Sequence, residues 1–141
     1  MAYDRSGAVI LPNFAATGAA LDAALDFAGS DADEAPLAMT MPCKGRVLGI
    51  MYITAEAVKC ASTAGVLALH IDDVEVMTVP IADNEVVDTM YTKLGTLASG
   101  KNGEFAAGDV LKVELKTGCL EGGAETGQGM VFPIVALDQG P

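Results

Sequence analysis

His70 is the only histidine of the chain and the first residue whose type could do acid–base or metal chemistry. It sits in a strand-like run, on the opposite side from Leu67, Leu69 and Ile71. A solvent-facing strand residue, or a buried histidine with a hydrogen-bond partner, fits this pattern better than a catalytic group. Catalytic metal sites draw on several ligands, commonly more than one histidine, so a lone histidine argues against a metal centre.

No other group of potentially reactive residues has the spacing of a specific catalytic or binding motif. Serine and aspartate are present, but no Gly-x-Ser-x-Gly elbow accompanies them, so a catalytic triad is not indicated. The Gly-rich stretch from Gly122 to Gly127 lacks the Gly-Lys-Ser/Thr of a phosphate-binding loop and is predicted to be a loop of the fold. The sequence therefore predicts no enzyme and no cofactor.

Carboxylates gather in three places, but none follows a calcium-binding pattern, and we interpret them as solvated turn charge. These groups are Asp31, Asp33 and Glu34; Asp72, Asp73 and Glu75; and Asp83 and Glu85. The three cysteines are Cys43, Cys60 and Cys119. They are too widely spaced for a paired metal motif or a disulfide framework, so we predict reduced, packed thiols and no metal site.

Composition restricts the partners. The 141 residues carry a formal net charge of −11, which argues against nucleic acid or an anionic membrane as a binding partner. Apolar residues make up 51% of the chain, yet no run approaches the roughly 20 apolar residues of a membrane helix. We expect other subunits to cover the extra apolar surface, and hence a homo-oligomer. The first residues, from Met1 to Gly7, do not resemble a secretory signal.

The elements that would position any site are short strands. Leu111, Val113 and Leu115 alternate with polar residues from Val110 to Lys116, which predicts a half-buried strand. A Gly108-Asp109 pair before it predicts a tight turn anchored by Phe105. Further strands are predicted at 37–41, 46–55, 65–71, 74–81, 85–92 and 130–137, with a loop from 95 to 103.

Three details of these strands can be predicted. Asp72-Asp73 has the length of a two-residue hairpin turn, and the change of phase after it predicts a bulge near Val76. The strands 46–55 and 130–137 are apolar on both faces, and the first of them should therefore be central in its sheet or covered by a neighbour. Pro133 would confine the last strand to an edge or a bulge.

The first 35 residues differ from the body. Val9 to Phe14 is an apolar burst, and Leu21, Ala24, Leu25 and Ala28 recur at helical spacing in a segment too short to be a stable isolated helix. We predict an N-terminal arm over residues 1–35, extended or partly helical, and a sandwich domain over 36–141. The strand count and turn spacing predict an all-β fold, an antiparallel β-sandwich or jelly roll.

The body resembles the small β-sandwich decoration, or cement, proteins on the heads of tailed bacteriophages. The resemblance covers about two-thirds of the chain, from about Met41 to Leu137, and rests on three segments within it: Pro42 to Val47, Ala64 to Asp72, and Phe105 to Glu114. It implies a non-enzymatic virion protein, often a trimer, assembled in the host cytoplasm. Such a protein sits on the capsid exterior and stabilises the lattice by bridging major capsid subunits.

Under this reading the arm supplies the contacts to the capsid or to a sister subunit. The residues expected to make them are Val9, Ile10, Leu11, Phe14, Leu21, Leu25 and Phe27. An arm that folds back over its own sandwich is an equal alternative. The alternative function is a receptor- or glycan-binding module of a phage fibre, since a sandwich presents loops equally well for ligand capture.

Overall fold

The computed structural model of the chain describes residues 8–10, 25–26, 37–59, 65–81, 86, 88–117 and 126–138. This part of the chain contains strands, turns and loops and no helix, so it offers no helix that could cross a membrane. The strands are β1 (Ala8–Ile10), β2 (Leu25–Asp26), β3 (Leu37–Thr40), β4 (Gly45–Lys59), β5 (Gly65–Ile71), β6 (Val74–Ile81), β7 (Met90–Leu94), β8 (Thr96–Leu97), β9 (Glu104–Phe105), β10 (Val110–Thr117) and β11 (Thr126–Leu137).

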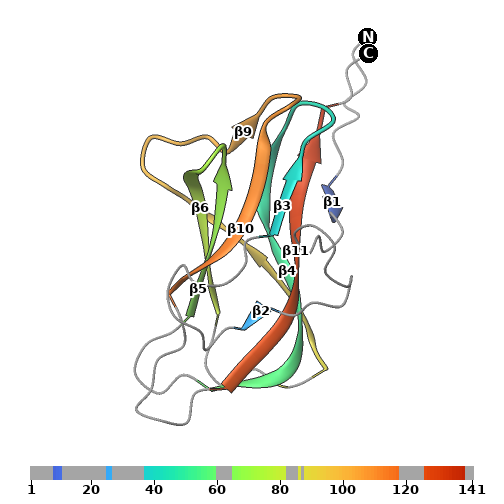
Figure 1. Cartoon of the computed structure of the whole chain (residues 1–141), viewed down its shortest axis with the longest axis vertical. Coiled ribbons are helices and arrows are strands. Elements are labelled where there is room, and N and C mark those ends of the chain that lie inside the picture. Colours follow the sequence, from blue (N-terminus) through green and yellow to red (C-terminus); the bar gives the residue numbers. More distant parts are fainter. Residues whose placement is uncertain are drawn as a thin grey trace.

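The strands form two antiparallel sheets that pack face to face. Sheet A has the order β1-β11-β4-β7, with β2 added to β11 and β9 added to β4, and sheet B has the order β3-β10-β5-β6-β8. In Figure 1, β4 and β11 run side by side in one layer, while β10, β5 and β6 lie in the other. The predicted all-β antiparallel sandwich is confirmed.

The strand order is that of a jelly roll. Without the two-residue strands, eight strands remain, and in chain order they form one sheet of 1-8-3-6 and one of 2-7-4-5. The first strand pairs with the last and the second with the last but one, which is how two Greek keys fold a long hairpin over itself. Strands distant in sequence are therefore neighbours throughout sheet A.

The core lies between the sheets and takes its side chains from alternate positions of each strand. Fully buried members include Ile50 and Tyr52 of β4, Leu69 of β5 and Val113 of β10, and Phe105 of β9 closes one end. In β10 the residues alternate between buried and partly exposed, as predicted. Burial of this kind stabilises the sandwich by about 1.5–3 kcal/mol for each large apolar side chain.

The β5–β6 hairpin is confirmed in detail. Asp72 and Asp73 have φ angles of 50° and 64°, the left-handed values that a type I′ two-residue turn requires at both positions. Leu69 pairs with Met77 and His70 with Glu75, so Val76 is the extra residue of a bulge. The bulge buries both Val76 and Met77, which resolves the change of phase seen in the sequence.

The turn before β10 is also as predicted. The Asp109 N–H donates to the Ala106 carbonyl at 3.3 Å, and Gly108 at the third position has φ 94°, which fits a type II turn. The Ala106 N–H in turn donates to Oδ2 of Asp109 at 2.7 Å. The turn therefore depends on both residues of the Gly-Asp pair.

Two strand predictions need correction. The strand expected at 85–92 begins only at Met90, because Asp88 takes a left-handed φ of 55° and its N–H donates to the Thr54 carbonyl instead of joining a ladder. Inside the loop expected at 95–103, Thr96–Leu97 pairs with β6 as β8.

The last strand is not at an edge, but its register with β4 shifts between Ile134 and Val135, close to Pro133, as the predicted bulge requires. β11 lies between β4 and the short strands β1 and β2. Pro133 falls between the residues paired with β2 (128–129) and those paired with β1 (134–136), and among the described strands only β4 pairs with it. Pro133, which has no N–H to donate, therefore lies where one side of β11 has no partner among the described strands.

The N-terminal segment is described at two short strands only. Ala8–Ile10 and Leu25–Asp26 pair with β11 of the same chain, so at both places the segment lies along sheet A. Leu25 is in a strand and does not follow the helical spacing seen in the sequence. The arm and domain boundaries themselves remain predictions.

Candidate functional site: two unlike outer faces

The outer face of sheet A is apolar. The strands β11, β4 and β7 lie side by side, and alternation places the neighbours of the core residues on the side turned away from sheet B. Three cross-strand rows result: Ile134, Gly49 and Leu94; Phe132, Met51 and Thr92; Met130, Ile53 and Met90. Thr92 is the only polar residue among the nine, whereas a sheet face turned to water normally alternates to polar side chains.

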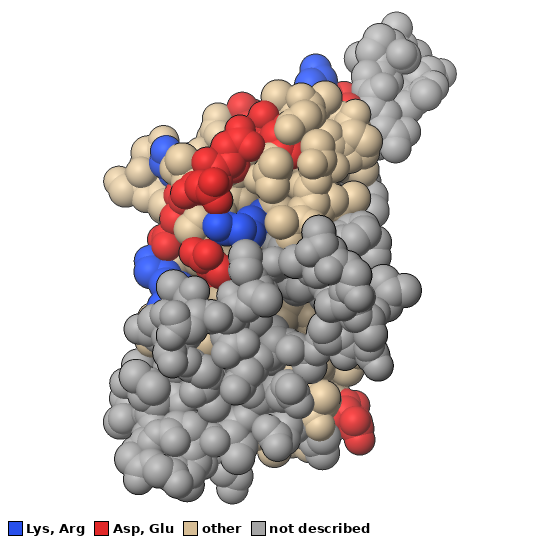
Figure 2. All heavy atoms as spheres, viewed as in Figure 1, with Lys and Arg blue, Asp and Glu red and all other residues tan. Residues whose placement is uncertain are grey.

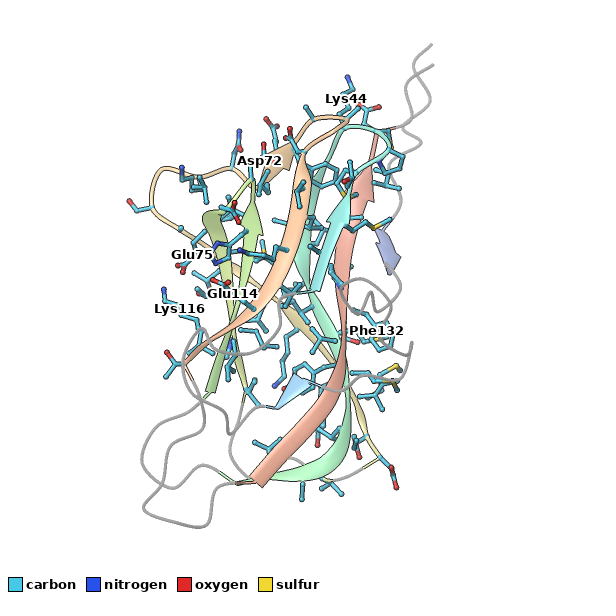
Figure 3. All side chains as sticks on the ribbon, in the orientation of Figure 1. Lys44, Asp72, Glu75, Glu114, Lys116 and Phe132 are labelled. Carbon is cyan, nitrogen blue, oxygen red and sulfur yellow. The ribbon has the colours of Figure 1, made fainter. Side chains whose placement is uncertain are left out.

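Burial on this face falls from the centre toward the β7 edge. Met51 is 8% exposed and Ile134 6%, whereas Met90 is 62% and Leu94 79% exposed. Figure 3 shows Phe132 on the side of the molecule opposite to the labelled charges of sheet B. We call the nine residues of the three rows the apolar outer face. It is continuous from β11 to β7 and open at β7.

The close approach of β7 to β4 explains the single glycine in these rows. A Cβ on Gly49 would overlap the main-chain carbonyl oxygen of Lys93, so only glycine lets β7 approach β4 at this point. On the core side, the rings of Tyr52 and Tyr91 stack with centroids 5.4 Å apart, and Nζ of Lys93 lies 5.6 Å from the centroid of Tyr91. The strand is therefore held closely on its inner side.

Thr54 fixes the loop before β7. Its hydroxyl is buried and donates to the Val86 carbonyl, and it accepts the Thr89 N–H at 3.2 Å. The Val86 N–H donates to the Tyr91 hydroxyl at 2.9 Å. The main-chain groups of Val86 and the N–H of Thr89 thereby find partners in side chains of β4 and β7. The side chain of Val86 is left 61% exposed.

The outer face of sheet B is charged. Nζ of Lys112 lies 2.8 Å from Oδ1 of Asp73 and 3.6 Å from Oε2 of Glu114, and Nζ of Lys116 lies 2.7 Å from Oε1 of Glu75. Figure 2 shows acidic and basic side chains gathered on this side, and Figure 3 shows Glu75, Glu114 and Lys116 close together on it. We call these residues, with His70, the charged outer face.

Two groups of the charged outer face have shifted pKa values. The hydrogen bond from Lys112 lowers the pKa of the Asp73 carboxyl, with the lysine charge as a further cause. The same hydrogen bond raises the pKa of Lys112, which exceeds the opposing effect of burial. Asp73 itself is exposed, so solvent screens the pair and its contribution to stability is small.

His70 lies on this face as its parity predicts, but it is largely covered, with a side chain 12% exposed. Its Nε2 is 2.7 Å from Oε1 of Glu114, yet neither ring nitrogen makes a hydrogen bond of acceptable geometry. We therefore treat the pair as a close polar contact only. The described residues contain no group of three metal-ligating side chains.

A shallow hollow of about 350 Å³ opens where β4 begins, between β9 and β11. Its charged lining consists of Lys44, Arg46, Glu104 and Asp138, with Lys44 and Asp138 paired at 3.1 Å. Two cations and two carboxylates leave it without a net charge to attract an ion of either sign. Cys43 nearby is a free thiol.

The structure describes only some of the residues that the sequence predicts as contact residues. Val9 and Ile10 lie in β1, in register with Val135 and Ile134, and Leu25 lies in β2, in register with Gly129. Leu11, Phe14, Leu21 and Phe27 lie outside the described residues. Their contact role stays a prediction. Of the carboxylate groups, Asp72, Asp73 and Glu75 are brought together at the β5–β6 hairpin.

Sequence reasoning did not identify the apolar outer face as a site. Its signal was present, because the strands 46–55 and 130–137 were recognised as apolar on both faces. Of the exposed residues of β7, Met90 lies inside the strand predicted at 85–92, whereas Leu94 lies beyond its end, so the sequence did not place the two on one strand.

Comparison with known proteins gives little. No protein-family model matches the sequence, and no curated protein matches it. Among solved structures, the chain is similar to a Paenibacillus sp. cycloisomaltooligosaccharide glucanotransferase complexed with cycloisomaltoheptaose, with a TM-score of 0.43 and 10% sequence identity. The alignment covers 94% of this chain and 16% of that chain. We draw no inference about activity or ligand from a likeness this distant.

Proposed function

We propose that the protein is a structural component of a tailed-phage virion that decorates the outside of the capsid and stabilises the lattice by bridging major capsid subunits. The observation that carries this proposal is the apolar outer face, which ends in the exposed side chains of Met90 and Leu94. Exposed apolar side chains grouped beside a buried apolar surface are typical of contact surfaces between proteins.

A bridging role needs no chemistry. A rigid sandwich that binds two capsid subunits stabilises the assembled shell by mass action, because it binds the assembled state and not the separated subunits. Engagement of two subunits by one chain adds avidity without strengthening either contact. The net charge of −11 suits an exterior position, away from the packaged nucleic acid.

The contacts with the capsid are assigned to two surfaces. One is the apolar outer face, and the other is the N-terminal segment with the residues proposed from sequence. β1 and β2 lie along β11, so this segment borders the apolar outer face in the fold. Both surfaces can therefore contribute to one contact area.

The test is reconstitution. Purified chain is mixed with undecorated capsids of the phage that encodes it, and the washed shells are imaged by electron cryo-microscopy. Regular extra density on the capsid exterior is the expected result. Bare shells would contradict the proposal, and binding on a glycan array in that case would support the fibre-module alternative.

Three variants separate the surfaces. Leu94→Lys places a charge on the exposed margin of the apolar outer face, and Val74→Lys is its control, because Val74 is an exposed valine on sheet B. A double Leu11→Ser and Phe14→Ser variant tests the N-terminal segment. We expect shell occupancy to fall for the first and third variants and to stay unchanged for the control. Equal occupancy for all three would remove both surfaces from the proposed contact.

A further inference from the structure

β7 has one side that no described strand covers. Its two ends are held on the β4 side: the Thr54 N–H donates to the Thr89 carbonyl at 3.1 Å, and the Gly95 N–H donates to the Leu48 carbonyl at 3.0 Å. Alternate residues of a strand direct their N–H and C=O groups the same way. Tyr91 and Lys93 therefore face β4, and the main-chain groups of Met90, Thr92 and Leu94 face away from it.

This edge lacks most devices that prevent strands from pairing. Residues 90–94 contain no proline, and their register with β4 shows no bulge. They contain no carboxylate, although the chain has 19 acidic residues. The one charge, on Lys93, lies over the Tyr91 ring of the same chain. A second copy of this acidic protein meets no like acidic charge along this strand.

The sequence of the strand is complementary to itself. If two copies of Met90–Leu94 run antiparallel about Thr92, then Met90 of each faces Leu94 of the other, and the two threonines face each other. Met90 and Leu94 both lie on the apolar outer face, so the pair buries the two most exposed apolar side chains of sheet A against one another. Tyr91 of each copy then stands opposite Lys93 of the other, which keeps the two lysines apart.

We propose that two copies of the chain associate through β7, extending sheet A across a two-fold axis. The main-chain groups of Met90, Thr92 and Leu94 then find partners, on the order of six hydrogen bonds in all. Each row of the apolar outer face continues into the second copy, so that Ile134, Gly49 and Leu94 are followed by Met90, Ile53 and Met130. One continuous apolar face results, twice as wide as that of a single chain.

This pairing is two-fold, so it predicts a dimer and not the trimer that the resemblance to decoration proteins implies. It does not depend on the capsid proposal, because it is tested in solution with the full chain alone. If the chain failed to bind capsids, the dimer proposal would still stand. If the chain were a monomer that decorates capsids, the dimer proposal would be overturned and the capsid proposal would not.

The first test is the mass in solution by light scattering coupled to size exclusion, over micromolar concentrations. A dimer is expected, and Leu94→Lys is expected to weaken it by about tenfold or more, because it faces Met90 of the second copy. Val74→Lys is the control and should leave the dimer unchanged. A monomer, a trimer, or a dimer that Leu94→Lys does not weaken would overturn the proposal.

The second test fixes the register. Opposed residues of a hydrogen-bonded antiparallel pair have Cα atoms about 5.5 Å apart, which is within disulfide range. Thr92→Cys should therefore cross-link to itself on mild oxidation, giving a covalent dimer on a non-reducing gel. Thr96→Cys should not, since position 96 lies in β8 of sheet B and not on the β7 edge; the parent chain controls for the native cysteines. Absence of the cross-link at 92, or equal cross-linking at 96, contradicts the proposed pairing.

Discussion

The two outer faces of this jelly roll have opposite chemistry although both belong to antiparallel sheets in one small domain. Sheet B turns lysines and carboxylates outward, and they pair at 2.7–2.8 Å at the surface. Sheet A turns methionine, isoleucine and phenylalanine outward around a single threonine. A sandwich needs only its inner faces to be apolar, yet the centre of this outer face is also buried within the chain itself, and only its β7 margin, at Met90 and Leu94, is open.

The difference between the two outer faces also predicts where a substitution should lower the stability most. On the charged outer face the side chains keep much of their hydration, so removing one pair changes little. On the apolar outer face a charge at the centre loses its hydration without gaining a partner. Four predictions follow this contrast from the largest effect to the smallest.

The largest effect is expected for Met51→Lys at the centre of the apolar outer face. Met51 is nearly buried, so an unpaired ammonium group there should lower the free energy of unfolding by about 3 kcal/mol or more. Thr40→Lys, at an exposed position of β3, is the matched change on sheet B and should stay within about 0.5 kcal/mol. Urea unfolding of both variants makes the comparison, and equal midpoints would mean that the two faces do not differ.

The next largest loss of stability is expected for Gly49→Ala, which prevents the close approach of β7 to β4. The new methyl group overlaps the Lys93 carbonyl oxygen, so the strand must shift, at a cost of about 2 kcal/mol. Gly95→Ala is the control, because there the methyl meets the flexible side chain of Met77 and the cost should be nearer 1 kcal/mol. Thermal unfolding ranks the two, and a larger loss for Gly95→Ala would contradict the assigned contact.

A smaller effect is expected for Lys116→Met on the charged outer face. The variant removes the contact with Glu75, in which both side chains are partly exposed, so the loss should be less than about 1 kcal/mol. Lys101→Met provides the control, since Lys101 lies in an exposed turn with no ion pair among the described residues. If Lys116→Met proved as costly as Met51→Lys, the charged outer face would have to be counted among the main stabilising contacts of the fold.

The smallest effect is a pH dependence at Asp73. Lys112 lowers its folded-state pKa below the ordinary value of 3.8, so the folded form favours the ionised carboxyl. The stabilisation is present above pH 3.8 and disappears as the pH falls through the lower folded-state pKa. Asp73→Asn should therefore have a slightly lower melting temperature than the parent at neutral pH, with the gap closing in acid and in high salt. A gap that widens in acid would reverse the assigned sign.

The sequence predicted the parts of the fold that depend on local pattern. Alternation gave β10, the phase change gave the bulge at Val76, and the turn residues gave the hairpin at Asp72 and Asp73. Asp-Asp is a weaker turn signal than Asn-Gly, but Asp72 adds a tertiary contact, because its Oδ1 accepts the Val110 N–H at 2.8 Å. That bond ties the hairpin to the neighbouring strand, and no local pattern contains it.

For the candidate site, the sequence predicts the apolar strands but not how they come together. Apolarity on both faces of β4 and β11 is visible in the sequence, but their adjacency to each other and to Met90 and Leu94 depends on pairing between distant segments. The start of β7 depends on Thr54, which fixes the preceding loop from another strand. Local pattern alone therefore points to the N-terminal segment, where an apolar burst is evident from one stretch of sequence.

The place of β11 in the chain bears on how the protein forms during synthesis. β11 is the last of the described strands to be synthesised, yet it is the strand against which β1, β2 and β4 pair. Sheet A cannot close until β11 has emerged from the ribosome, whereas β5 and β6 can pair early through their two-residue turn. The nascent chain therefore carries the apolar side chains of β4 without their β11 neighbours until that point, and the emergence of β11 is the step that protects them from aggregation.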